Sequence, residues 1–337
     1  MSKMIEWWLN QNPLSKDEYD LLFNTRPENK QFVDDEKYND LEDEYFKRMP
    51  FCNIDSTNRV ITFSECATNF INYVFKTYVD DDTLVIYSNC EHPNVQTNIQ
   101  SCKNSLQLNH YFDIRTLNVN KIINESKKYK KVFVYIIGTQ ISNGEITPQE
   151  FFIKLKKMFI ENNIEHKIFL DDVHGMFFVP RDYSIFDFIL FTAHAVIDDY
   201  DMGIFISKSG EYGEKIYNWG KLYLNMLDVI LKRKEKIFYF YEVMTEYFSS
   251  LLASDDFKLL NRISPHLFSI KINNKFPCPQ RFYEKLSKIY IKLEKDGIDI
   301  KYILLRGAWF IKRPEYLLEG LAILKDLLYC YNIILNK

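Results

Sequence analysis

The sequence Phe-Leu-Asp-Asp-Val-His-Gly at residues 169–175 carries a short apolar run into a polar cluster. A second run, Phe-Ile-Leu-Phe at residues 188–191, ends in the same way at Thr192 and His194. Such short apolar runs are typical of strands that are buried on both faces of a parallel sheet. In open α/β sheets, ligands bind at the carboxyl ends of the strands. The two stretches therefore predict a binding site that contains Asp171, Asp172, His174, Thr192 and His194.

The composition predicts a compact globular protein. A chain of 337 residues can bury a sizeable core, and its ten Gly and ten Pro leave little room for flexible linkers. The formal net charge of −3, with interspersed signs, provides neither a basic surface for nucleic acid nor a polybasic membrane patch. The six cysteines have no paired Cys-x-x-Cys spacing, and no apolar window reaches the roughly 18 residues of a membrane span. We therefore expect a cytoplasmic protein with reduced thiols.

Apolar runs alternate with amphipathic stretches through the first two thirds of the chain. This alternation predicts right-handed βαβ units and a mainly parallel sheet. Later stretches indicate long helices over 215–250, strands over 264–272 and 298–305, and a helix over 280–295. We expect an N-terminal helical segment over 1–54, a large α/β domain over 55–235 and a smaller α+β domain over 236–337.

Two further motifs follow predicted strands. Ser-Glu-Cys-Ala-Thr-Asn at residues 64–69 opens a helix, whose N-terminal N–H groups can bind an anion. An ordinary helix cap by Ser64 or Thr68 explains the same residues. Asn-Cys-Glu-His-Pro-Asn at residues 89–94 follows the strand over 83–88 and contains His92. A single histidine at a strand end fits a structural role as well as a functional one.

The order of these motifs resembles the fold-type I pyridoxal-phosphate (PLP) enzymes, specifically the class V aminotransferase and cysteine desulfurase group. In that group an Asp-x-x-His/Gln strand end precedes Ser/Thr-x-His-Lys, as Asp171 and His174 precede Thr192 and His194 here. Glu-His-Pro-Asn at 91–94 and the Gly144 and Pro148 spacing match two further motifs of the group. The resemblance implies a three-layer large domain, a small C-terminal domain and a homodimer with the cofactor site at the subunit interface.

The resemblance also implies a role for each matched residue. Asp171 would face the ring nitrogen, where a carboxylate keeps the ring an electron sink. His174 would bind the ring hydroxyl, and a polar contact near Gln140 or Ile141 is expected. His92 would stack on the ring. The phosphate would be held by Thr68, Thr192 and His194. Arg306 matches the arginine that binds the α-carboxylate of an amino-acid-like ligand, for which a bidentate fork is suited.

The departures from the group's pattern leave three functions open. The lysine that joins the cofactor covalently is replaced by Ala195, and three carboxylates (Asp198, Asp199 and Asp201) replace small residues beside it. One function is an enzyme that holds PLP or pyridoxamine phosphate non-covalently, with His194 or an outside amine moving the proton. A second is a catalytically inactive scaffold. A third is a divalent-metal site built from Asp171, Asp172, His174, Asp198, Asp199 and Asp201.

Overall fold

The structure of the protein is a computed structural model. It describes residues 14–49, 54, 59–64, 66–89, 91–108, 118–140, 146–175, 179–192, 203–208, 214–251, 257–259, 267–272, 280–288, 292–296, 299–306, 319–320, 322–327 and 329. Within these residues, no helix is long and apolar enough to cross a membrane.

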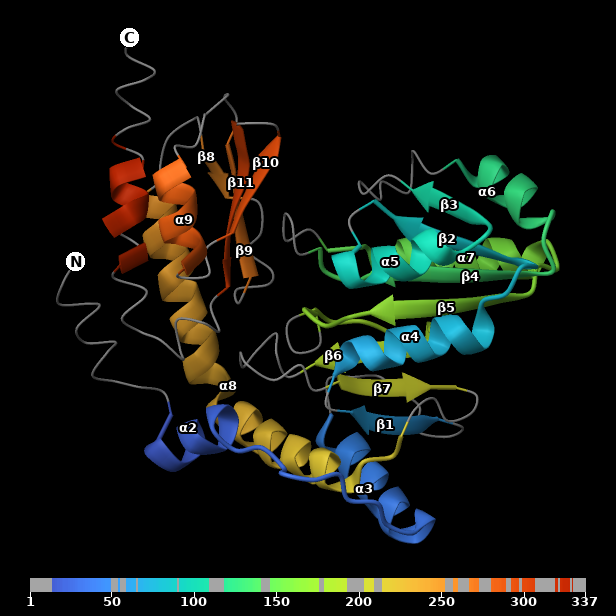
Figure 1. The fold of residues 1–337 in the computed structure, drawn as a ribbon, viewed down its shortest axis with the longest axis horizontal. Coiled ribbons are helices and arrows are strands. Elements are labelled where there is room, and N and C mark those ends of the chain that lie inside the picture. The colour runs from blue at the N-terminus through green and yellow to red at the C-terminus, as the bar shows by residue number, and fades with distance from the viewer. Residues whose placement is uncertain are drawn as a thin grey trace.

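A seven-stranded sheet forms the centre of the larger part of the molecule (Figure 1). Its strand order is β1-β7-β6-β5-β4-β2-β3, and strands β3, β2, β4, β5 and β6 run parallel to one another. Strand β7 is antiparallel to both of its neighbours, so β1 runs in the same direction as β6. The strands are β1 Val60–Ser64, β2 Thr83–Ser88, β3 Ser105–Leu108, β4 Lys131–Ile137, β5 His166–Asp171, β6 Phe188–Thr192 and β7 Gly203–Ser207. The expectation of a mainly parallel sheet is confirmed.

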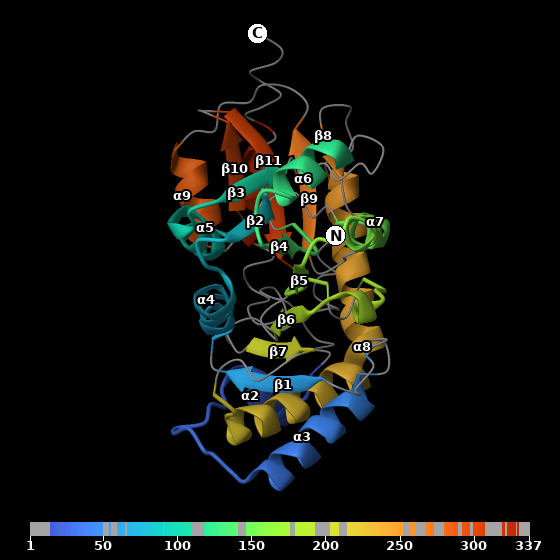
Figure 2. The ribbon, with the colours of Figure 1, turned by 90° about the vertical axis from the view of Figure 1, so that its right-hand side faces the viewer.

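Helices cover both faces of this sheet, which makes three layers (Figure 2). Helices α4 (Ala67–Tyr78) and α5 (Pro93–Ser101) lie on one face, and α6 (Val119–Ser126) and α7 (Gln149–Glu161) lie on the other. Because side chains alternate along a strand, each strand contributes to two separate cores. In β4, Phe133 and Tyr135 pack beneath α4 and α5, whereas Val134 packs in the core on the α7 side.

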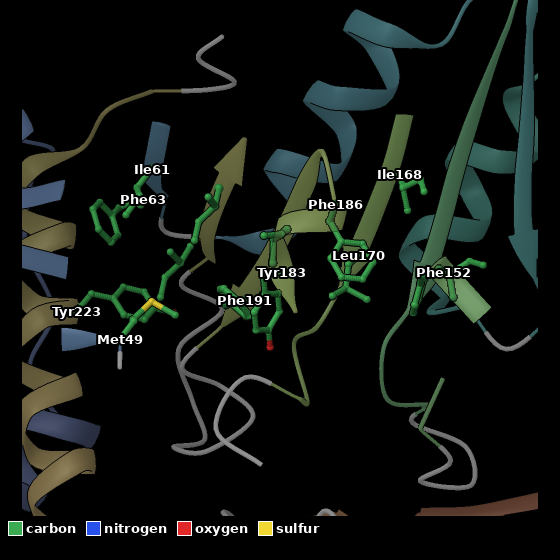
Figure 3. Packing of buried hydrophobic residues seen from close by; sticks show 14 of the residues in the cluster. Met49, Ile61, Phe63, Phe152, Ile168, Leu170, Tyr183, Phe186, Phe191 and Tyr223 are labelled. Atoms are coloured by element: carbon green, nitrogen blue, oxygen red, sulfur yellow. The ribbon is translucent and has the colours of Figure 1, made fainter. Parts of the chain in front are cut away.

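The core on the α7 side extends to the N-terminal helices. Helix α3 (Asp35–Arg48) buries Tyr38, Leu41 and Tyr45, and it packs with α2 (Lys16–Phe23) against the long helix α8. Figure 3 shows this core from Phe152 to Tyr223, with Tyr183 lying among the aromatic and aliphatic side chains near β6. The N-terminal helices therefore complete the main core, with their charged residues on the outside, as the sequence indicated.

Helix α8 (Tyr217–Leu251) joins the two sheets without a break. At 35 residues it is about 50 Å long, so it spans from the β1 side of the large sheet to the second sheet (Figure 1). The domain boundary expected between residues 235 and 236 falls inside this helix.

The second sheet has four antiparallel strands in the order β10-β11-β9-β8. Its elements are β8 Phe257–Leu259, β9 Leu267–Ile272, α9 Gln280–Lys288, β10 Lys292–Asp296 and β11 Asp299–Arg306. The prediction of a helix over 280–295 was wrong in its last part, because α9 ends at Lys288 and β10 pairs with β11 as a hairpin. Asp296 followed by Gly297 is a typical hairpin turn signal, and it takes precedence over the helical spacing.

Candidate active site

The carboxyl ends of the parallel strands form one edge of the large sheet. In the strand register, Ser64 and Thr192 both pair with Gly203, and Ile137 pairs with Asp171. In Figure 1 this edge faces the four-stranded sheet. The strand ends that the sequence predicted to carry the site, at Asp171 and Thr192, therefore lie on the same edge.

Asp171 and Thr192 also belong to the same face of the sheet. Asp171 follows Phe169 at a spacing of two, and Thr192 follows Leu190 in the same way. Phe169 and Leu190 both pack in the core beneath α4 and α5. By strand alternation the two polar side chains belong to that face, at the point where its core ends.

The carboxylate of Asp171 is buried and held by two donors. The hydroxyl of Tyr135 donates a 2.6 Å hydrogen bond to Oδ2, and the backbone N–H of Val173 donates a 3.2 Å bond to Oδ1. Burial raises the pKa of Asp171 to about 6, although both hydrogen bonds act against the rise. Near pH 7 the group is therefore a buried carboxylate, which is the form that can face a protonated ring nitrogen.

The adjacent Asp172 has a structural role on the opposite face. Its Oδ1 lies 3.3 Å from Nε of Arg181, and its Oδ2 accepts a hydrogen bond from the hydroxyl of Tyr183, which lies in the core on the α7 side. Both charged side chains are almost fully buried, with exposures of 0% for Asp172 and 1% for Arg181. A Cβ atom on Gly175 would lie 2.1 Å from Oδ1 of Asp172, so only glycine fits there. The two consecutive aspartates therefore serve different purposes.

Glu91 is a second buried carboxyl group near Asp171, and the sequence analysis did not identify it as a site residue. Its Oε1 accepts a 2.6 Å bond from the hydroxyl of Ser88, and its Oε2 accepts a 3.2 Å bond from the backbone N–H of Ile137. Burial raises the pKa of Glu91 to about 8; the charge of Asp171 acts in the same direction, and the hydrogen bonds from Ser88 and Ile137 act against it. Its position directly before His92, within a matched motif, was the signal that could have found it.

Thr68 and His92 lie at two neighbouring helix N-termini. Thr68 is the second residue of α4, and its hydroxyl accepts a 3.1 Å hydrogen bond from the side-chain amide of Asn94. His92 is the N-cap of α5, and its Nδ1 accepts a 3.2 Å bond from the backbone N–H of Asn94. Asn94 thus links the two predicted cofactor residues.

The start of α4 differs from the expected cap. The N-cap is Cys66 and makes no side-chain capping bond, so the alternative explanation of these residues, a cap by Ser64 or Thr68, was wrong. The chain enters α4 very close to β7, because a Cβ on Gly203 would lie 2.7 Å from Cα of Ala67. The N–H groups of the first turn therefore lie beside the carboxyl ends of β1 and β6.

Two other predicted residues are buried at this edge. His174 is 3% exposed in the turn after β5, and Thr192 is 3% exposed at the end of β6. The hydroxyl oxygen of Thr192 has no hydrogen-bond partner among the residues that the structure describes. Because a buried polar atom costs free energy unless it is paired, this hydroxyl is suited to a bound polar group.

Lys208 lies far from the predicted site. It follows the last residue of β7, and Ser207 pairs with Phe188 at the start of β6. Lys208 therefore lies at the opposite edge of the sheet, about 15 Å of strand away from Thr192. There its Nζ donates to the carbonyl of Ser184.

Several predicted residues lie outside the described residues. These are His194, Ala195, Asp198, Asp199 and Asp201, together with Ile141 and Gly144. Arg306 is described as the last residue of β11, opposite Leu267, but its side chain is not. Among the described residues no group of three His, Cys, Asp or Glu side chains could hold a metal ion. Asp171 and Asp172 lie on opposite faces of the sheet. The described residues therefore do not support the predicted metal site.

This arrangement is the fold of the fold-type I PLP-dependent enzymes. Three solved structures share it: a NifS-like protein from Rickettsia africae, the ureidoglycine–glyoxylate aminotransferase of Bacillus subtilis, and the histidinol-phosphate aminotransferase of Clostridium acetobutylicum. Their TM-scores are 0.64, 0.66 and 0.62, at sequence identities of 13%, 12% and 14%. The matches cover 97%, 95% and 96% of this chain and 94%, 91% and 95% of the other chains. No protein-family model and no curated protein matches the sequence.

The described residues fit a pyridoxal cofactor chemically. The buried carboxylate of Asp171 suits a ring nitrogen that carries a proton. The hydroxyl of Thr192, unpaired within the described part of the chain, and the α4 N-terminus lie along the same edge and suit a phosphate group. The acceptor therefore suits the ring of such a cofactor, and the donors suit its phosphate.

Proposed function

We propose that this chain is a class V aminotransferase-like protein that binds PLP or pyridoxamine phosphate without a covalent bond and acts on an amino-acid-like carboxylate. The observation that carries the proposal is the buried carboxylate of Asp171, which lies on the same edge and face of the sheet as the hydroxyl of Thr192, for which the described residues provide no hydrogen-bond partner. When bound, the cofactor supplies an electron sink.

Each predicted site residue has a separate role in this proposal. Asp171 holds the ring nitrogen in its protonated form, and His174 orients the ring hydroxyl. His92 covers one face of the ring, and Thr192 and Thr68 bind the phosphate with the first turn of α4. His194 moves the proton that the group's lysine would move.

The substrate and the assembly are parts of the same proposal. Arg306 ends β11 in the second sheet, and the carboxyl edge of the large sheet faces that sheet (Figure 1). An arginine there suits a substrate carboxylate, because its guanidinium can donate two parallel hydrogen bonds. A homodimer is expected, and the mass of the protein in solution, measured by light scattering, tests it.

A binding experiment tests the cofactor directly. Purified protein is titrated with PLP, reduced with borohydride and dialysed. The proposal expects saturable binding that dialysis reverses, with no cofactor mass left on residues 193–208 after reduction. The absence of saturable binding of both PLP and pyridoxamine phosphate would instead favour the inactive scaffold.

A further inference from the structure

Two side chains outside the predicted cofactor contacts converge on Asp171. We propose that Tyr135 and Glu91 are positioning residues: Tyr135 sets the charge of Asp171 and Glu91 sets the total charge beside it, so that the site presents one buried negative charge to a cationic ring near neutral pH. This inference rests on the proposed function, because a pyridine cofactor is the ligand that it concerns.

Tyr135 is a fixed donor. Its ring is fully buried in β4, with its centroid 4.7 Å from that of Phe169 and 5.9 Å from that of Phe75. Burial raises the pKa of Tyr135 well above its usual value, so the hydroxyl keeps its proton through the neutral range. The 2.6 Å bond from this hydroxyl stabilises the ionised form of Asp171. With the N–H of Val173 on the other oxygen, both ends of the carboxylate are held.

Glu91 controls the total charge. It is 3% exposed, and it joins Ser88 at the end of β2 to Ile137 at the end of β4. Ile137 is the register partner of Asp171, so Glu91 is bonded to the end of β4, the strand that lies between β2 and the β5 strand of Asp171. Two buried groups of the same charge resist simultaneous ionisation. Asp171, with a pKa of about 6, ionises before Glu91, with a pKa of about 8.

The consequence is a pH window around neutrality in which the pair carries a single charge. Below the window both carboxyl groups are neutral, and above it both are charged. A protonated pyridine ring carries one positive charge, so charge matching is best inside the window. Other titratable groups on the elements around this edge, within the described chain, include Cys66, Tyr87, His92, Asp172 and His174; Asp172 is paired with Arg181, and its charge also raises the pKa of Asp171.

The pH profile of ligand affinity tests this inference. Pyridoxamine phosphate is the probe, because it has no aldehyde to react with surface lysines, and its dissociation constant is measured from pH 5 to 9. For the parent protein, affinity is expected to fall as the pH drops through about 6. Tyr135→Phe removes the donor, so the midpoint of this fall should rise by about one pH unit. Glu91→Gln should leave that midpoint unchanged and remove a second step near pH 8.

A purely structural role of Tyr135 and Glu91 would give a different pH profile of ligand affinity. It would weaken binding equally at every pH and leave both midpoints in place, which would overturn the inference. If Tyr135→Phe does not fold, Ser88→Ala takes its place as the variant. Loss of the Ser88 hydroxyl removes a donor from Glu91, so the step near pH 8 should move upward.

A cofactor-free measurement separates the inference from the proposed function. The unfolding free energy of Asp171→Asn is compared with that of the parent at each pH, with and without Tyr135→Phe. The difference curve should inflect near pH 6, and at a higher pH in the Tyr135→Phe background. If the inflections appear as expected but pyridoxamine phosphate does not bind, the cofactor proposal is refuted. The inference about the charges of Asp171 and Glu91 then still holds. If pyridoxamine phosphate binds but the inflections are identical with and without Tyr135→Phe, the inference about the charged pair is refuted. The cofactor proposal then still holds.

Discussion

The hydroxyl of Tyr135 and the carboxylate of Asp171 are joined by a 2.6 Å hydrogen bond between neighbouring strands β4 and β5. The bond lies where the aromatic core beneath α4 and α5 meets the carboxyl edge of the sheet. One partner is therefore fixed by packing, and the other ends its strand at that edge. The position and the pKa of the Asp171 carboxylate therefore both depend on how Tyr135 packs in the core.

The first prediction concerns Asp171→Asn and cofactor affinity. At pH 7.5 the parent carboxylate is ionised, so the neutral variant should bind pyridoxamine phosphate at least about tenfold more weakly, or about 1.4 kcal/mol. At pH 5 the parent group is itself protonated, and the two proteins should bind alike. Fluorescence titration at both pH values measures the effect. Glu161→Gln, on the far helix α7, is the control and should match the parent. Equal affinity of Asp171→Asn and the parent at pH 7.5 would contradict the assignment.

The second prediction concerns Glu91 and stability. The folded pKa of about 8 lies above the usual 4.5, so the folded state holds this proton more tightly than the unfolded state. Stability should therefore fall as the pH rises from about 4.5 to 8, by an amount on the order of a few kcal/mol. Glu91→Gln should flatten this part of the curve. Urea unfolding at pH 5, 7 and 9 measures it, and parallel curves for the two proteins would show that Glu91 does not titrate in this range.

The third prediction separates Asp172 from Asp171. Arg181→Ala leaves the charge of Asp172 buried without its cation and should cost about 3–5 kcal/mol of unfolding free energy. Asp171→Asn is the matched variant one residue away, and it should cost far less near neutral pH, because it removes a carboxylate that burial destabilises. Chemical denaturation at pH 7.5 provides both values. Similar losses in the two variants would mean that both aspartates are structural.

The sequence predicted much of the fold because the buried strands carry a simple signal. The strand at Thr83–Ser88 was predicted with its observed ends, since it is a continuous apolar run between polar stretches. Ser105–Leu108 was missed because it is an edge strand whose alternate residues are exposed. The hairpin of β10 and β11 was missed because charged residues in β10 hide its pattern.

The candidate site was predictable only where a side chain ends a strand or belongs to a matched motif. Asp171 and Thr192 satisfy the first condition, and Thr68 and His92 the second. Tyr135 satisfies neither condition, because in the sequence it is one aromatic residue within an apolar strand. Its contact with Asp171 depends on the register of β4 against β5, which a single sequence does not specify. The separate roles of Asp171 and Asp172 were hidden for the same reason.

The fourth prediction concerns Thr192→Val. The buried hydroxyl has no partner among the described residues, so its replacement by a methyl group should leave the cofactor-free protein as stable or slightly more stable. If the hydroxyl binds phosphate, the affinity for pyridoxamine phosphate should fall about tenfold, while pyridoxamine without phosphate is unaffected. Thr139→Val is the matched control, because that hydroxyl is also buried and lacks a partner in the described chain. An equal loss of affinity for both ligands would place Thr192 away from the phosphate.

The fifth prediction concerns the position of the missing lysine. Residue 195 follows His194 as the lysine does in the resembled group, so Ala195→Lys should place an amine beside the proposed ring. On addition of PLP, this variant should gain an absorption band of a covalent imine, and borohydride should fix the cofactor to residue 195. Lys208 remains as an internal control, because it lies at the other edge of the sheet and should carry no cofactor in either protein. Gain of the band in the variant, with reversible binding in the parent, would mean that the pocket is intact and lacks only its amine. No band in the variant and no affinity in the parent would mean that the fold has been kept without its cofactor, and that its present role is to bind something else.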